Sequence, residues 1–144
     1  MTLKAALLTM AALLVAAPAL LVAAPAFAHH SFAMFDRDKT IRIAGVVKEY
    51  EWTNPHVWLH IMAPDKDGKS VQWSFEMQSI AQDSRAGWRA DSVKPGDKVT
   101  VEYHPLKDGS RGGQLTAGVL ANGTRLGPPP PDGFLSLTPG DGGI

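Results

Sequence analysis

The sequence predicts an all-β domain that contains one short helix and closes as a small five-stranded barrel. From Ile41 to Leu120 most segments alternate apolar and polar residues with a period of two, as half-buried strands do. Clusters of Gly, Pro, Asn and Asp divide this stretch into strand segments. The segment between the third and fourth strands lacks that period and favours a helix. The order strand-strand-strand-helix-strand-strand is that of the OB-fold, and another small barrel or a sandwich is the alternative.

The first strand is predicted over residues 41–52. Ile41 and Ile43 alternate with polar neighbours, and the period changes phase at Gly45-Val46-Val47. A glycine at a phase shift indicates a β-bulge or a coiled bend, which a small barrel needs. Asn54-Pro55 ends the strand, because proline cannot donate to a strand ladder and asparagine favours turns.

The second and third strands are predicted over residues 56–62 and 70–77. Alternation directs one set of side chains to the core and the other set to solvent. We expect the core set to be Val57, Leu59, Ile61, Val71, Trp73, Phe75 and Met77. A turn centred near Lys66 keeps both strands in phase and pairs Leu59 with Trp73.

The same register predicts a solvent-side patch on these two strands. It places His60 beside Gln72, Trp58 beside Ser74, and His56 beside Glu76. OB-folds bind ligands on the faces of their second and third strands. The candidate ligand-binding residues are therefore Trp58, Gln72, Ser74 and Glu76. The alternative is that Trp58 is simply covered by residues 32–35 or by the C-terminal tail.

The remaining elements follow from cap and turn signals. A short helix is predicted over residues 80–88, with Ser79 as its N-cap. Two more strands follow over residues 98–103 and 114–120. The glycine-rich segment 109–113 between them predicts a hairpin loop and not a phosphate-binding loop, because it opens no helix.

Residues 1–28 have the pattern of a cleavable signal peptide. They carry one charge, Lys4, and a long apolar run that ends in Ala26-Phe27-Ala28, the small-x-small pattern of a cleavage site. The apolar run is long enough to span a bilayer, so an uncleaved anchor is the alternative. Pro18 and Pro25 disfavour a spanning helix. We therefore expect a periplasmic or secreted protein without membrane contact after cleavage.

Cleavage would leave a barrel domain at residues 29–126 and a Pro- and Gly-rich tail at 127–144, which we expect to be disordered. The chain contains no cysteine, so export exposes no thiol to oxidation. Its 14 basic and 14 acidic residues cancel, which gives no electrostatic footprint for nucleic acid. Nucleic-acid binding is not expected.

Cleavage after Ala28 would expose His29 as the first residue. A terminal histidine offers its α-amine and its ring Nδ1 to one ion, and a further imidazole completes a histidine brace, a set of nitrogen donors that favours Cu(II). The candidate metal ligands are His29 with one of His56, His60 and His104, and the weaker additions are Met34, Asp36 and Glu76. The alternative is a solvated His-His terminus with adventitious affinity only.

The sequence contains no nucleophile elbow, phosphate-binding loop or zincin helix, so we predict no catalytic residues and favour a binding module over an enzyme. The first hypothesis is an exported Cu(II)-binding module that handles metal in the periplasm. The second is a metal-free module that binds a periplasmic protein partner or a small apolar ligand on the Trp58 face. The third is a copper oxidoreductase, since a brace with an open position supports redox chemistry.

The chain also resembles a family of small bacterial secreted proteins that is known only as a domain of unknown function. The resemblance covers about residues 29–126 and rests on the segments His29-His30-Ser31-Phe32, Phe35-Asp36, Glu51-Trp52-Thr53-Asn54-Pro55-His56, Trp73-Ser74-Phe75-Glu76 and Lys94-Pro95-Gly96-Asp97. It implies export and a small β-barrel. It implies no particular activity.

Overall fold

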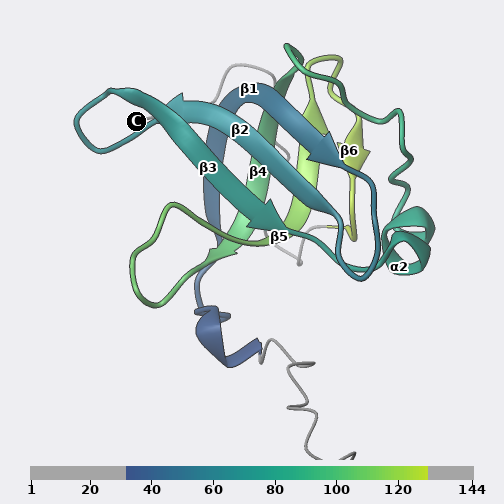
Figure 1. Ribbon diagram of the computed structural model, residues 1–144, viewed down its shortest axis with the longest axis horizontal. Helices are drawn as coiled ribbons and strands as arrows, with labels where there is room; N and C mark the ends of the chain where they lie inside the picture. Colours follow the sequence, from purple (N-terminus) through teal and green to yellow (C-terminus); the bar gives the residue numbers. More distant parts are fainter. Residues whose placement is uncertain (1–31, 130–144) are drawn as a thin grey trace, which may run out of the picture. The chain divides into compact units, whose positions relative to one another are not determined.

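The computed structural model describes residues 32–129. Its elements (Figure 1) are η1 (Phe32–Met34), β1 (Ile41–Glu51), β2 (Trp58–Pro64), β3 (Ser70–Glu76), α2 (Ile80–Arg85), β4 (Lys98–Pro105), β5 (Gly112–Leu120) and β6 (Arg125–Leu126). The predicted signal peptide, His29 and the tail beyond Pro129 lie outside the described residues. Within the described part of the chain, no helix is long and apolar enough to cross a membrane.

The first five strands form a closed barrel. Neighbouring strands pair antiparallel in the order β3-β2-β1-β4-β5, and a parallel pairing of β3 with β5 joins the two ends. The short strand β6 was not among the five predicted strands, and it pairs with the C-terminal part of β5. This closed order, with a helix between the third and fourth strands, is the OB-fold arrangement. The predicted fold class is therefore confirmed.

Two adjacent glycines allow β5 to approach the strands on both sides of it. A Cβ atom at Gly112 would lie 2.0 Å from the main-chain oxygen of Ser74, and one at Gly113 would lie 2.0 Å from that of His104. Both distances are far inside van der Waals contact, so a larger residue would force the strands apart. The predicted hairpin loop thus gives its last two residues to β5, where they close the barrel.

The phase shift in β1 is a β-bulge that follows the glycine instead of including it. The pairing of β1 with β2 changes register between Val47 and Glu49, which leaves Lys48 as the extra residue. Gly45 has a different role, because a Cβ atom there would lie 2.6 Å from the main-chain oxygen of Met62. The bulge was predicted correctly and its position was not.

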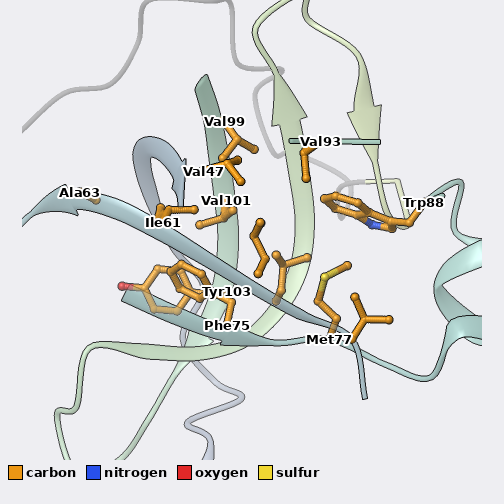
Figure 2. Packing of buried hydrophobic residues seen from close by; sticks show 13 residues of the cluster. Val47, Ile61, Ala63, Phe75, Met77, Trp88, Val93, Val99, Val101 and Tyr103 are labelled. Carbon is orange, nitrogen blue, oxygen red and sulfur yellow. The ribbon is translucent and has the colours of Figure 1, made fainter. Parts of the chain in front are cut away.

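The core occupies the barrel face that alternation predicts. The predicted core residues that are buried are Val57, Leu59, Ile61, Phe75 and Met77, and those that are partly buried are Val71 and Trp73. Figure 2 shows the buried residues of the core, among them Phe75 and Tyr103, whose ring centroids lie 4.8 Å apart. The assignment of strand faces from the sequence is therefore confirmed.

α2 begins where predicted but ends earlier. Ser79 is the N-cap, since its side chain accepts a hydrogen bond from the Gln82 N–H and the Gln82 side chain accepts one from the Ser79 N–H. Gly87, at φ 94°, then turns the chain so that Trp88 enters the core. The predicted continuation of the helix to Trp88 is therefore wrong, because the Trp88 indole packs inside the barrel. It lies so close to Gly118 that a Cβ atom at Gly118 would be 2.7 Å from the indole ring.

The hairpin of β2 and β3 keeps the predicted faces but has a different register. Leu59 pairs with Phe75 and not with Trp73, so each predicted partner is displaced by two residues. The cause is in the turn, where the Asp65 carboxylate accepts two main-chain N–H hydrogen bonds and Gly68 adopts φ 76°. These contacts centre the turn one residue later than expected. A shift of two residues leaves the faces unchanged, because side chains alternate with a period of two.

Glu102 of β4 joins three strands through two arginines. Its side chain is only 3% exposed. Both terminal nitrogens of Arg125 in β6 donate to its carboxylate at 2.8 Å, and Nε of Arg42 in β1 donates at 3.0 Å. The hydrogen bonds from Arg125, and to a smaller extent those from Arg42, hold the pKa of Glu102 below its ordinary value. The ionised carboxylate therefore stabilises the fold.

Phe75→Ala should lower the free energy of unfolding by about 3–5 kcal/mol, the usual cost of replacing a core aromatic by alanine. Trp58→Ala should cost much less, because Trp58 lies on the outer face of β2. Urea denaturation of both variants measures the two losses. Equal losses would contradict the assignment of faces.

Glu102→Gln should lower the free energy of unfolding at pH 7 by about 3 kcal/mol, since it leaves two arginines without their anion. The pKa of Glu102 is lower in the folded than in the unfolded chain, so its contribution is present at neutral pH and is lost as pH falls below about 4.5. Urea denaturation at pH 7 and pH 3 should show the difference from wild type shrinking at pH 3. The exposed Asp91→Asn is the control, and a loss independent of pH would count against the ion triad.

Candidate functional site

The outer faces of β1, β2 and β3, which lie side by side (Figure 1), carry the candidate site. Leu59 and Ile61 of β2 are fully buried, so His60 between them points away from the core. The strand register places His60 opposite Glu49 of β1 and opposite Ser74 of β3. An imidazole therefore lies at the centre of a three-stranded polar surface.

The bulge in β1 brings two glutamates to this surface. If Lys48 were an ordinary strand residue and not a bulge, the alternation from the buried Val47 would direct Glu49 and Glu51 toward the core. With it, Tyr50 packs against the core, and the glutamates on either side of it face outward. Sequence reasoning missed both glutamates. The phase shift was visible in the sequence, but the faces of the residues after it depend on which residue is the extra one.

His60 is held on both edges and on one face of its ring. Nε2 lies 3.0 Å from Oε1 of Glu51, and Nδ1 lies 2.8 Å from Oγ of Ser74. The ring of Trp58 lies nearly parallel to the imidazole, at an angle of 6° and a centroid distance of 6.0 Å. The imidazole side chain is 13% exposed. These contacts leave the imidazole little rotational freedom.

Glu49, Glu51 and His60 form a group of potential metal ligands. One ligand atom from each residue lies within 4.8 Å of those of the other two. Glu49 is exposed, and the other two are half-buried. We call these three residues the sheet triad. Two anionic carboxylates and one imidazole nitrogen, open to solvent on one side, could hold a divalent cation.

The histidines predicted as the third nitrogen ligand lie in different places. Nδ1 of His56 lies 3.1 Å from the main-chain oxygen of Met77 and 3.1 Å from Oε1 of Glu76, which confirms the expected contact with Glu76 despite the changed register. Nδ1 of His104 lies 2.7 Å from the main-chain oxygen of Lys39. Of these three histidines, His60 is the one that belongs to a group of three potential ligands among the described residues.

The other predicted site residues are partly brought together. Gln72 of β3 is exposed and lies within 3.5 Å of His60, and Ser74 contacts the same ring. Glu76 is buried at 8% exposure and lies opposite Trp58, so it does not belong to an open patch. The weaker candidates are separate from the sheet triad: Met34 is exposed in η1, and Asp36 forms an ion pair with Lys39 at 2.8 Å.

A family of unknown function, DUF6152, matches residues 18–116. The chain belongs to this family. No curated protein matches the sequence. A crystal structure of Rim1, a mitochondrial single-stranded DNA binding protein of S. cerevisiae, is similar at 16% identity with a TM-score of 0.41, over 57% of this chain and 93% of that chain.

The matched residues include the sheet triad and the neighbouring residues Trp58, Gln72 and Ser74. The contacts of His60 suit either of two protonation patterns. A neutral ring can donate from Nε2 to Glu51 while Ser74 donates to Nδ1, or the ring can turn its Nε2 lone pair toward a cation while Nδ1 donates to Ser74. The second pattern is the usual arrangement of a metal-ligating histidine, with an oxygen of a neighbouring residue orienting the ring.

Proposed function

We propose that this protein is an exported metal-binding module and that Cu(II) is its ion. The observation that carries the proposal is the sheet triad, in which Glu49, Glu51 and His60 present two carboxylates and an imidazole within 4.8 Å of one another. Nitrogen and oxygen sites of this kind bind first-row divalent ions most tightly when the ion is copper. The role would be the handling or delivery of the metal in the periplasm.

The contacts of His60 support this role. On metal binding, Nε2 would exchange its contact with Glu51 for the ion, and Glu51 would become a ligand of the same ion. Ser74 would then accept from Nδ1–H and keep the ring oriented. The half-buried ring has few alternative orientations to give up, so binding costs little side-chain entropy.

His29 would complete the site after signal cleavage. Its α-amine and ring nitrogen would add two donors, and His60 would be the third nitrogen of the brace. His56 and His104 are less suitable as that third nitrogen, because neither belongs to a group with two carboxylates among the described residues. This part of the proposal requires cleavage directly after Ala28.

A second candidate function uses the same surface without metal. The ring of Trp58 is half-buried on the outer face of β2 and stacks on His60. Such a ring could hold a protein partner or a small apolar ligand. A ligand on Trp58 would lie against the His60 ring, so Cu(II) and this ligand would compete. Trp58→Ala would abolish the second function and would weaken Cu(II) binding only slightly, because Trp58 orients the His60 ring without being a metal ligand.

Wild-type protein that begins at His29 should bind one Cu(II), and His60→Gln should weaken binding at least tenfold, because it removes the nitrogen donor of the sheet triad. Glu51→Gln should weaken it less, since a carboxylate remains at Glu49. Calorimetric titration measures the affinities, and paramagnetic resonance reports the nitrogen donors. His104→Gln is the matched control and should bind as wild type does. Unchanged Cu(II) affinity in His60→Gln would refute the sheet triad as the site.

The exported protein should begin at His29, and His29→Ala should weaken Cu(II) binding and remove one nitrogen signature from the resonance spectrum. Intact mass spectrometry of the protein recovered from the periplasm gives the first residue. A different first residue, or a His29→Ala spectrum identical to wild type, would exclude the brace. The sheet triad would then be tested by His60→Gln alone.

A further inference from the structure

The Ser74 hydroxyl ends a chain of hydrogen bonds that crosses three strands. Its Oγ lies 2.8 Å from Nδ1 of His60, and Nε2 of the same ring lies 3.0 Å from Oε1 of Glu51. Ser74 is in β3, His60 in β2 and Glu51 in β1, so no local motif marks the three residues in the sequence. A hydroxyl, an imidazole and a carboxylate in this order are the parts of a serine hydrolase triad, which is recognised by geometry and not by sequence position.

The direction of these hydrogen bonds follows from Glu51. An ionised carboxylate only accepts hydrogen bonds, so without a metal the neutral His60 ring carries its proton on Nε2 and donates it to Glu51. Nδ1 then holds a lone pair, and the Ser74 hydroxyl donates to it. The ring cannot easily turn away from this contact, because it is 13% exposed and stacks on Trp58. Ser74 thus faces a base that an acid holds from the opposite edge, the arrangement that activates a serine nucleophile.

The Gln72 side chain supplies a hydrogen-bond donor beside the hydroxyl. Its Nε2 lies 3.3 Å from Oγ of Ser74, and its Oε1 accepts from Nζ of Lys48 at 2.5 Å. An ammonium group only donates, so Lys48 fixes the amide with its NH₂ group toward Ser74. When a hydroxyl attacks a carbonyl group, negative charge forms on the carbonyl oxygen next to the attacking atom, and a side-chain amide N–H placed there stabilises it.

We propose that the metal-free protein hydrolyses small carboxylic esters with Ser74 as the nucleophile. Oγ bonds to the ester carbonyl carbon while its proton passes to Nδ1 of His60, and Gln72 donates to the carbonyl oxygen. The C–O bond then breaks, the leaving alcohol takes the proton from Nδ1, and the acyl group stays on Ser74. Water attacks the same carbon, its proton passes through Nδ1 back to Oγ, and the carboxylic acid leaves. Glu51 keeps its charge throughout and positions the ring.

The surroundings of Ser74 determine the class of ester. Trp58 lies diagonally across from Ser74 in the strand register, a spacing that a large ring can bridge, so an aromatic leaving group could pack on the indole. The carboxylates of Glu49 and Glu51 would repel an anion, so the substrate is uncharged. This activity goes beyond the metal-binding role and belongs to the metal-free form, because a bound ion would occupy both His60 and Glu51.

The test uses the exported protein in the presence of EDTA, with 4-nitrophenyl acetate as the substrate and a fluorophosphonate as the covalent probe. We expect saturable turnover and the addition of one phosphonyl group per chain, which peptide mass spectrometry places on Ser74. Ser74→Ala should lose the label and at least nine-tenths of the turnover. Ser70→Ala is the matched control, since Ser70 lies on the same face of β3, and it should behave as wild type does. An unlabelled wild type, or equal turnover in Ser74→Ala, would overturn the proposal.

Two further variants test the roles of the neighbours. Gln72→Met should lower kcat about a hundredfold, the usual loss for one donor to the oxyanion. Glu51→Gln should lower kcat at least tenfold with KM unchanged, because Glu51 does not touch the substrate. An unchanged kcat in both variants, with thermal unfolding as in wild type, would refute the assigned roles.

Cu(II) titration of Ser74→Ala separates this proposal from the metal site. Ser74 orients the His60 ring without being a metal ligand, so the variant should keep most of its Cu(II) affinity while it loses hydrolysis. Because EDTA is present in the hydrolysis assay, that assay gives its answer whether or not the protein binds Cu(II). A failure of hydrolysis therefore overturns this inference alone.

Discussion

The approach of β5 to β3 is the constraint on which the rest of the structure depends. At its start β5 pairs with β3 on one side and with β4 on the other. The first two residues of β5 come so close to main-chain oxygens of these strands that neither has room for a Cβ atom. Gly112 and Gly113 meet this requirement, and the barrel closes around Phe75 and Trp88. Closure removes the exposed edges that β3 and β5 would otherwise present, and it turns two apolar sheet faces into one core.

A single extra residue links the fold to the candidate site. The bulge at Lys48 lets β1 bend around the barrel, and it also reverses which side chains of β1 face inward after it. Tyr50 then fills the core next to Trp88, and Glu49 and Glu51 reach the outer face. The feature that the barrel needs for its curvature is thus the one that assembles two carboxylates beside an imidazole. A strand of the same sequence that ran through Lys48 without a bulge would turn Glu49 and Glu51 toward the core and disperse the sheet triad.

The sequence was sufficient to predict the fold and the two faces of β2 and β3. The alternation of apolar and polar residues around Leu59 identifies the face that must be buried, whatever the exact strand pairing. It was insufficient for the hairpin register, since the turn is set by the local hydrogen bonds of Asp65. It was also insufficient for the sheet triad. Glu49 and Glu51 differ in no sequence property from other polar strand residues, and their meeting with His60 depends on the position of the bulge and on the register together.

Three buried carboxyl groups show two ways in which the structure accommodates an acid away from water. Glu102 is 3% exposed and is neutralised by two arginines, and Glu76 lies 3.1 Å from the His56 ring. Asp83 is buried to a similar degree, yet one of its carboxylate oxygens has no hydrogen-bond partner within the described residues. Burial without a partner lowers the stability of the fold by the desolvation cost of the group. The other two acids avoid this cost by pairing, whereas at Asp83 burial raises the pKa to about 6, so that the carboxyl group loses its charge, and with it most of the cost, below that pH.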